Sequence, residues 1–559
     1  MTDQRPISGA ERPARLLRLR GLGDKVFTGF ASGSILLIVL GLILVLAPML
    51  WRGAGAVVFQ GTVEFRRMQL EQFTRGDAAA VRAEIAQAAR ARQPLYDVLD
   101  RFSRGIATEH LGDEARRLYR EFGKQLDGRD APAAERRELR SLAKSLRDDL
   151  IEALETTDKA TARAALGRVL AHEGDPRLKA TPAEGFLRMA HDYSRIVETV
   201  DLGRRTEYAK ALGEVRDAVR GLFGPPLGGP RPPLVMDQYG ATRWDMAEKQ
   251  LARLLTAETW TEVRPGEPLQ RIEVPREQQF AGTDLAPLFP LVRERAAEML
   301  QPRWTFYGQY FTDDSLSGHY FGGVGPEILG TLLVTLLAIA FALPLGVISA
   351  AYLVECAGDS RTVGLIRTCI NTLAGVPSIV FGLFGLAFFV IFLLPKLGLP
   401  QGSSILAGGL TLGLLVLPIL IRASEEAIRA VPATYKEAAL ALGVSRFRCF
   451  VTVTLPAALP GILTGVILSV SRAAGETAPI LFTAAVAIGS PSWPPWEALA
   501  KPTRTLAYAS YHIAVGDRLA ALVPHNQYGM IMTLILLVLV LNVAAIFVRS
   551  RVAKRLRGQ

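Results

Sequence analysis

Long apolar segments alternate with amphipathic ones along this chain of 559 residues. A helix that crosses a membrane needs roughly 20 consecutive, mainly apolar residues. The fifth of the apolar segments is long enough to contain a broken or re-entrant piece. The six predicted membrane helices are residues 28–50, 328–354, 371–394, 404–421, 459–488 and 530–548.

The sequence between the first and second apolar segments has helical periodicity instead. Apolar residues recur there at three- and four-residue steps, as in Leu139, Leu142 and Leu146, which is typical of amphipathic helices. Residues 271–274 read as a short strand. Breaks rich in Gly and Pro fall at residues 128–132, 174–182 and 224–233. We expect a helical bundle to about residue 223, a linker at 224–233 and a mixed part at 234–325.

These patterns predict an all-α integral membrane protein with a mostly helical domain inserted between its first and second membrane helices. The first apolar segment is too long for a signal peptide and lacks a small-residue cleavage site, so we interpret it as a retained anchor. The predicted parts are a basic N-terminus (1–27), the first membrane helix (28–50), the inserted domain (51–325), a membrane domain (326–549) with a polar loop (422–456), and a basic tail (550–559).

Basic residues predict how the chain lies across the membrane, because short cytoplasmic segments collect Lys and Arg. With the N-terminus inside, the inner segments hold eighteen such residues and the outer connections hold four. Both termini and the loop at 422–456 are therefore predicted to be cytoplasmic, and residues 51–325 extracytoplasmic. Residues 52–325 carry 41 basic and 41 acidic residues, so the net charge of +11 belongs to the membrane part and its flanks. We attribute this excess of basic residues to the orientation of the chain in the membrane. We therefore expect no nucleic-acid partner.

The polar loop contains a predicted helix of about two turns at residues 435–442. Thr434 and Glu437 have the spacing of a capping box, in which each side chain accepts a hydrogen bond from a free backbone N–H of the first turn. Gly443 follows where a left-handed C-terminal cap would lie.

An Arg and a Glu stand inside the fifth apolar segment. Arg472 and Glu476 are spaced to share one helix face, and Pro479 would clash with the carbonyl of Gly475 and break the helix. Charged residues inside a membrane usually face the bundle interior and mark a pathway. Because a guanidinium offers a planar fork of donors, the pair indicates an anion pathway with an adjustable counter-charge. A purely structural ion pair is the alternative.

No catalytic or metal-binding pattern appears in the sequence. There is no Walker A sequence, nucleophile motif or GxGxxG after a strand, and the three Cys and six His show no ligand spacing. We therefore expect neither an enzyme nor a metal site.

The polar loop resembles the signature of ABC importer permeases. It reads E-A-A at residues 437–439, then Gly443 after three residues, then V-T-L-P at 453–456 after nine more, with Val453 in place of the usual Ile. The residues that this resemblance assigns to coupling with an ATPase are Glu437, Ala438, Ala439, Gly443, Leu455 and Pro456.

Three further runs resemble the PstA-type permease of the phosphate ABC importer. They are R-A-A-G-E-T-A-P-I-L at 472–481, the segment 325–346 that begins G-P-E-I, and A-G-V-P-S-I-V-F-G at 374–382. The resemblance covers the first span and residues 320–559, and leaves the inserted domain without a role. It implies passage of inorganic phosphate, with Arg472, Glu476 and Thr477 on the substrate pathway.

The resemblance also implies partners in a bacterial inner membrane. These are a second permease of the PstC type, a cytoplasmic ATPase dimer on the loop, and an extracytoplasmic phosphate-binding protein. ATP and Mg would be used by the ATPase, and this chain would need no cofactor. Alternatives are a permease for sulfate, molybdate or phosphonate, an ion-coupled carrier that uses Glu476 as a proton site, and a receptor with an outer sensor domain.

Overall fold

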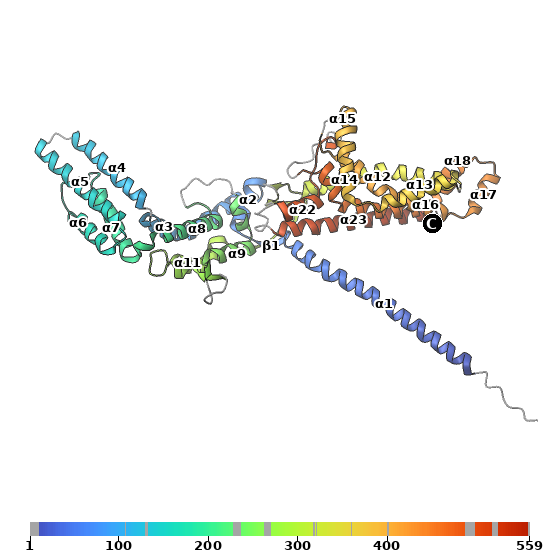
Figure 1. The fold of residues 1–559 in the computed structure, drawn as a ribbon, viewed down its shortest axis with the longest axis horizontal. Coiled ribbons are helices and arrows are strands. Elements are labelled where there is room, and N and C mark those ends of the chain that lie inside the picture. Colours follow the sequence, from blue (N-terminus) through green and yellow to red (C-terminus); the bar gives the residue numbers. More distant parts are fainter. Residues whose placement is uncertain are drawn as a thin grey trace, which may run out of the picture. The chain divides into compact units, whose positions relative to one another are not determined.

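The computed structural model divides the chain into two compact units, each described here by itself. One, the membrane unit, comprises Met1–Val58 and Phe306–Gln559, and the other, the inserted unit, comprises Phe59–Thr305. Both are built mainly of helices (Figure 1). The structure describes residues 11–106, 108–128, 132–226, 236–261, 270–316, 319, 321–358, 360–399, 402–486, 498–516 and 524–556.

The inserted unit is a helical bundle followed by a smaller mixed part. Its helices are α2 (Val63–Phe73), α3 (Ala78–Ile106), α4 (Thr108–Asp127), α5 (Ala133–Glu155), α6 (Lys159–Leu170), α7 (Glu184–Thr199), α8 (Arg205–Phe223), α9 (Trp244–Leu255), α10 (Arg276–Gln279) and α11 (Leu288–Leu300), with 3₁₀ turns at Leu202–Arg204 and Met236–Thr242.

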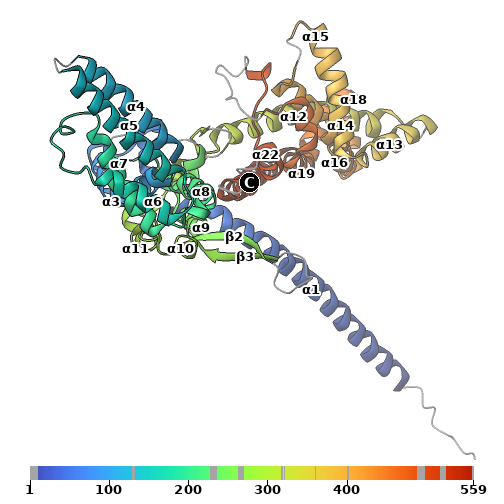
Figure 2. The same cartoon turned by 60° about the vertical axis from the view of Figure 1, so that its left-hand side comes forward.

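In the part of the chain that the structure describes, three two-stranded sheets accompany the helices. Strand β2 (Thr256–Thr261) pairs antiparallel with β3 (Gln270–Pro275), which confirms the predicted strand near residue 271 (Figure 2). Strands β1 (Val58–Gly61) and β4 (Arg303–Phe306) pair where the chain passes between the two units. In the membrane unit, β5 (Ser315–Leu316) pairs with β6 (Phe321–Gly322).

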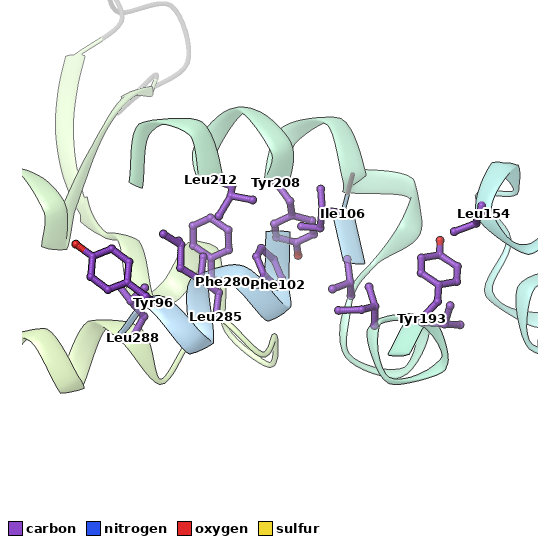
Figure 3. Close-up of a cluster of buried hydrophobic side chains, with 14 of the residues drawn as sticks. Tyr96, Phe102, Ile106, Leu154, Tyr193, Tyr208, Leu212, Phe280, Leu285 and Leu288 are labelled. Atoms are coloured by element: carbon purple, nitrogen blue, oxygen red, sulfur yellow. The ribbon is translucent and has the colours of Figure 1, made fainter. Parts of the chain in front are cut away.

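An apolar core extends through the inserted unit from α3 to α11. Phe102 packs edge-on against Phe280 with ring centroids 5.7 Å apart, and Tyr208 lies 5.8 Å from Phe280 (Figure 3). Tyr193 and Leu154 continue the core toward α5 (Figure 3). Such aromatic contacts add to the stabilisation from area burial alone, so α3, α8 and the mixed part form one packed body.

Arg92 joins three helices at the edge of this core. Its Nε donates to the carbonyl of Met299 (2.9 Å), and its Nη1 donates to the carbonyl of Phe223 (2.8 Å) and to Glu64 Oε1 (2.8 Å). Met299 and Phe223 lie in the last turns of α11 and α8, where carbonyls lack intrahelical donors. One buried guanidinium therefore satisfies two helix ends and one buried carboxylate.

Within the residues that the structure describes, the membrane unit contains six helices that are long and apolar enough to cross a membrane, which is the predicted number. The fifth covers Arg446–Gly475 rather than the predicted residues 459–488. Its helices are α1 (Glu11–Ala54), α12 (Gly325–Ala351), α13 (Arg361–Ala374), α14 (Ser378–Gly385), α15 (Leu394–Lys396), α16 (Ile405–Arg429), α17 (Ala433–Ala441), α18 (Arg446–Cys449), α19 (Leu455–Gly475), α20 (Ala478–Thr483), α22 (Leu506–Gly516) and α23 (Pro524–Leu556), with a 3₁₀ turn at Gly308–Phe311 and π-helical turns at Tyr352–Cys356, Leu386–Leu393 and Phe450–Thr454.

The predicted bounds of the third membrane helix were wrong. The apolar helix covers Ser378–Lys396 rather than residues 371–394, because α13 ends at Ala374 and α14 begins only at Ser378. Pro377 disfavours helical backbone at the residue before it. The chain therefore turns between the two helices instead of continuing as one.

Small residues allow the membrane helices to approach closely. A Cβ added to Gly408 of α16 would lie 2.4 Å from Ala484 Cβ, and one added to Gly413 would lie 2.6 Å from Phe341 Cδ1 of α12. Ser404 caps α16 by accepting a hydrogen bond from the N–H of Ala407 (3.1 Å). Such small-residue contacts are typical of membrane helix packing, and they place α16 against α12 and the segment after α20.

Replacing Arg92 tests the joint in the inserted unit. Arg92→Met keeps the apolar stem but leaves two helix-terminal carbonyls without this donor and leaves buried Glu64 with only the longer contact to Arg67 (3.5 Å) among the described residues. Removing one partner of a buried ion pair costs about 3–5 kcal/mol, so we expect the inserted unit of the full chain to become protease-sensitive at lower urea concentration.

Arg168→Met is the matched control. Arg168 pairs with Asp149 and Glu152, but its side chain is half-exposed, and such surface pairs contribute only about 0–1 kcal/mol. If the urea concentration for protease sensitivity fell equally in the two variants, the role given to Arg92 would be contradicted.

Candidate substrate pathway and coupling loop

The fifth apolar segment breaks where the sequence predicts a break. Helix α19 ends at Gly475, Glu476 is extended (φ −77°, ψ 125°), and α20 begins at Ala478. Pro479 lies in the first turn of α20, where its missing N–H costs no intrahelical bond. The prediction that Pro479 prevents the helix from continuing through Gly475 is confirmed.

Arg472 and Glu476 form an ion pair beside this break. Arg472 Nε lies 3.5 Å from Glu476 Oε1, and the side chains are 39% and 21% exposed. Ala473 and Ala474 of the same turn are buried. In this subunit by itself, the alanines pack inward and the charged side chains stay partly open. The prediction that the pair faces the bundle interior and marks a pathway stays a prediction. A partly open face is available to an anion or to a second subunit.

Thr477 is the second of the two residues between α19 and α20. Its carbonyl accepts from the N–H of Leu481 (3.0 Å), and its hydroxyl does not cap α20. One residue before Arg472, Ser471 of α19 donates to Asn542 Oδ1 of α23 (2.8 Å). The structure thus brings together the three residues predicted for the pathway, Arg472, Glu476 and Thr477, at one break between two helices.

The loop helix exists, but its start was predicted incorrectly. Helix α17 begins at Ala433 after Pro432, and no side chain caps its first turn. Thr434 and Glu437 therefore form no capping box, because proline, whose fixed φ suits a helix start, begins the helix early enough to place Thr434 inside it.

The predicted end of the loop helix is confirmed. Gly443 has φ +79°, and its N–H donates to the carbonyl of Leu440 (2.9 Å). The N–H of Val444 donates to the carbonyl of Ala439 (3.4 Å). These two bonds form a Schellman motif, which requires a left-handed residue at this position.

The exposed surface of the loop is unusually apolar. Leu442 is 85% exposed, Phe447 79% and Tyr435 57%, while Glu437 and Ala438 are also exposed and Ala439 is buried. Lys436 pairs with Glu355 Oε1 at 2.5 Å, which ties α17 to the π-helical turn at Tyr352–Cys356 that continues α12. The helix therefore has an anchored side and a free side that suits a protein partner.

Helix α19 carries two of the predicted coupling residues at its start and one of the predicted pathway residues near its end. Leu455 and Pro456 form the first turn of α19, while Arg472 lies 17 residues further on, about 25 Å along the helix at 1.5 Å per residue. Helix α19 thus connects the two predicted sites without bringing them into contact.

A buried charged cluster at the start of α12 was missed by sequence reasoning. Glu327 is fully buried, Arg504 Nη1 lies 3.2 Å from Glu327 Oε1, and His319 Nδ1 lies 3.3 Å from the same oxygen. Burial, together with the nearby Arg504 and His512, lowers the pKa of His319 to about 4, so the imidazole is neutral near pH 7. Only the fold brings these residues together; no sequence signal links them.

The family match to known proteins lies within the C-terminal part of the membrane unit. The family described as binding-protein-dependent transport system inner membrane component matches residues 342–558. A probable ABC transporter permease protein, YqgI of Bacillus subtilis, is 33% identical over 259 residues, which are 44% of this chain and 85% of that protein. The chain belongs to the ABC transporter permeases of this family.

Two further similarities concern this permease. The phosphate transport system permease protein PstA 1 of Mycobacterium tuberculosis is 35% identical over 242 residues, 43% of this chain and 74% of that protein. The MetNI methionine ABC transporter in an inward-facing conformation has 19% identity and a TM-score of 0.31 over 40% of this chain and 94% of that one. The family match includes the loop and the Arg472 break, and it does not reach the inserted unit.

The cap of α17 can be tested by Gly443→Ala. A Cβ in left-handed backbone costs roughly 1–2 kcal/mol, so amides 439–444 should exchange with deuterium up to about tenfold faster in the detergent-solubilised permease. Gly364→Ala in α13 is the control, because it has helical backbone and no atom within 4 Å of the added Cβ. Unchanged exchange in Gly443→Ala would show that the loop does not depend on this cap.

Proposed function

We propose that this permease is a PstA-type subunit of an ATP-driven importer that passes inorganic phosphate across a bacterial inner membrane. Family membership, together with the phosphate transport system named for a relative of which the chain covers 74%, supports this proposal. The observation that carries it physically is the partly open Arg472–Glu476 pair at the break between α19 and α20.

The pair has the chemistry for a transient oxyanion site. The Arg472 guanidinium is permanently charged and presents several N–H donors, which fit a tetrahedral oxyanion. Glu476 lies 3.5 Å away, close enough to neutralise Arg472 when no anion is bound and far enough to be displaced. An arriving phosphate would exchange places with the carboxylate, and the returning carboxylate would favour release.

The distribution of Lys and Arg supports cytoplasmic termini and a cytoplasmic α17 loop. The inserted unit would then be extracytoplasmic. On that side we expect a soluble phosphate-binding protein, and beside this subunit a second permease of the PstC type.

A separate cytoplasmic ATPase dimer would use ATP and Mg and bind the α17 loop. The exposed side chains of Leu442 and Tyr435 would enter its surface, and Glu437 would lie within the contact. The Lys436–Glu355 pair would transmit a movement of α17 to α12, and the continuous chain from α18 would transmit it to α19.

Arg472→Gln tests the substrate site. The substitution keeps side-chain length but removes the charge and the donor fork. Loss of a charge-assisted hydrogen bond is worth about 1.5–3 kcal/mol, so phosphate uptake by the assembled complex should fall about tenfold to hundredfold at normal membrane abundance.

Glu476→Gln is the matched variant for the same test. Without the counter-charge, Arg472 should hold phosphate longer, so slow release should lower both kcat and KM. Normal uptake by Arg472→Gln at normal abundance would mean that the pair is structural.

Glu437→Lys tests coupling to the ATPase. Reversing an exposed charge on α17 should weaken assembly with the ATPase, or its stimulation by substrate, because like charges across an interface are disfavoured. Co-purification and ATPase activity are the readouts. Lys396→Glu, a charge reversal outside the loop, should leave both unchanged, and equal effects in the two variants would remove α17 from the mechanism.

A further inference from the structure

Arg504 is the centre of the buried charged cluster at the start of α12. Its side chain is 4% exposed, and besides Glu327 it pairs with Asp314 and donates to Ser315 Oγ (2.6 Å). Glu327 is in the first turn of α12, where the helix dipole also favours a carboxylate. The guanidinium therefore binds α12 and the segment that precedes it.

The backbone around Arg504 is fixed to the same helix. A Cβ on Gly330 would lie 1.9 Å from the carbonyl oxygen of Arg504, so glycine is required for this approach. The N–H of Leu506 donates to Thr331 Oγ1 (3.0 Å). Segment 503–506 thus lies directly on the first two turns of α12.

The other side of this segment is bonded to the end of α20. The N–H of Thr503 donates to the carbonyl of Ala484 (2.9 Å), and the N–H of Val486 donates to the carbonyl of Thr503 (3.3 Å). Ala484 follows directly after α20, the six-residue helix that begins beside Glu476. A chain of contacts therefore runs from Glu327 through Arg504 and Thr503 to α20.

We propose that Arg504, paired with Glu327, is a positioning residue that fixes α20, and with it the break at Glu476, relative to α12. Helix α20 is too short to hold its own position, since isolated helices of this length are unstable. A buried ion pair is directional and contributes to a specific arrangement more than to stability. Where transport is the readout, the proposal rests on the proposed function; its geometric part does not.

The geometric part can be measured by electron paramagnetic resonance. Spin labels at Leu481 of α20 and Leu336 of α12, both exposed, report the distance between these helices once Cys356, Cys369 and Cys449 are replaced. In the full chain, Arg504→Met should broaden or shift this distance distribution. Arg549→Met is the control, because Arg549 of α23 is partly exposed and donates to Thr464 Oγ1 (3.0 Å), outside the Arg504 cluster; it should leave the distribution unchanged.

Measurements of phosphate uptake separate a positioning role of Arg504 from a general loss of stability. In the assembled complex, Arg504→Met should raise the KM for inorganic phosphate by about tenfold while kcat changes less than about twofold. Arg504→Lys keeps the charge but not the fork and should lie between wild type and Arg504→Met. If Arg504→Met does not accumulate, Glu327→Gln, which keeps the shape of the side chain, should show the same two effects.

The results distinguish this proposal from the proposed function. If the wild-type complex takes up no phosphate, the substrate assignment fails, and the distance measurement still decides the role of Arg504. An unchanged, narrow distribution in Arg504→Met or Glu327→Gln at normal abundance would overturn the positioning role. A fall in uptake that only follows a fall in abundance would overturn it as well.

Discussion

The break in the fifth apolar segment is the constraint on which the membrane unit depends. Hydrocarbon offers no water to backbone groups, so each one released by a broken helix needs a partner within the protein. The carbonyl of Thr483 accepts from the N–H of Ser404 (2.8 Å), and that of Ala484 accepts from Thr503 (2.9 Å). Segments from two other parts of the chain therefore complete the hydrogen bonding at the end of α20. Because these hydrogen bonds hold the end of α20 in place, the Arg472–Glu476 pair has a defined position beside the break.

Two helices connect the α17 loop to the break between α19 and α20 and to its supports. Helix α19 begins next to the loop and ends at the break. Helix α12 contains Glu327 of the buried cluster, and the π-helical turn that continues it contains Glu355, the partner of Lys436. The 28 residues from Glu327 to Glu355 span about 40 Å, roughly the thickness of a membrane with its headgroup regions. In the proposed mechanism, a movement imposed on α17 by the ATPase reaches the Arg472 site along α19 and the supports of α20 along α12.

Much of this architecture is predictable because membrane helices and glycine caps are local features. Six apolar segments predict the six helices, Pro479 predicts the break, and Gly443 predicts its left-handed cap. The errors arise where proline acts on its neighbours: Pro377 separates α13 from α14, and Pro432 starts α17 before Thr434 can cap it. The cluster of Glu327 and Arg504 was not predictable, because residues 177 positions apart meet only through the packing of α12 against segment 503–506.

The central claim is that this permease passes phosphate in a process driven by ATP. Uptake of radiolabelled phosphate by proteoliposomes that contain the complex purified with its partners tests it most directly. The account predicts uptake that requires ATP on the side of the α17 loop and is abolished by excess unlabelled phosphate but not by sulfate. Uptake driven by an ion gradient without ATP, or equal competition by sulfate, would contradict it.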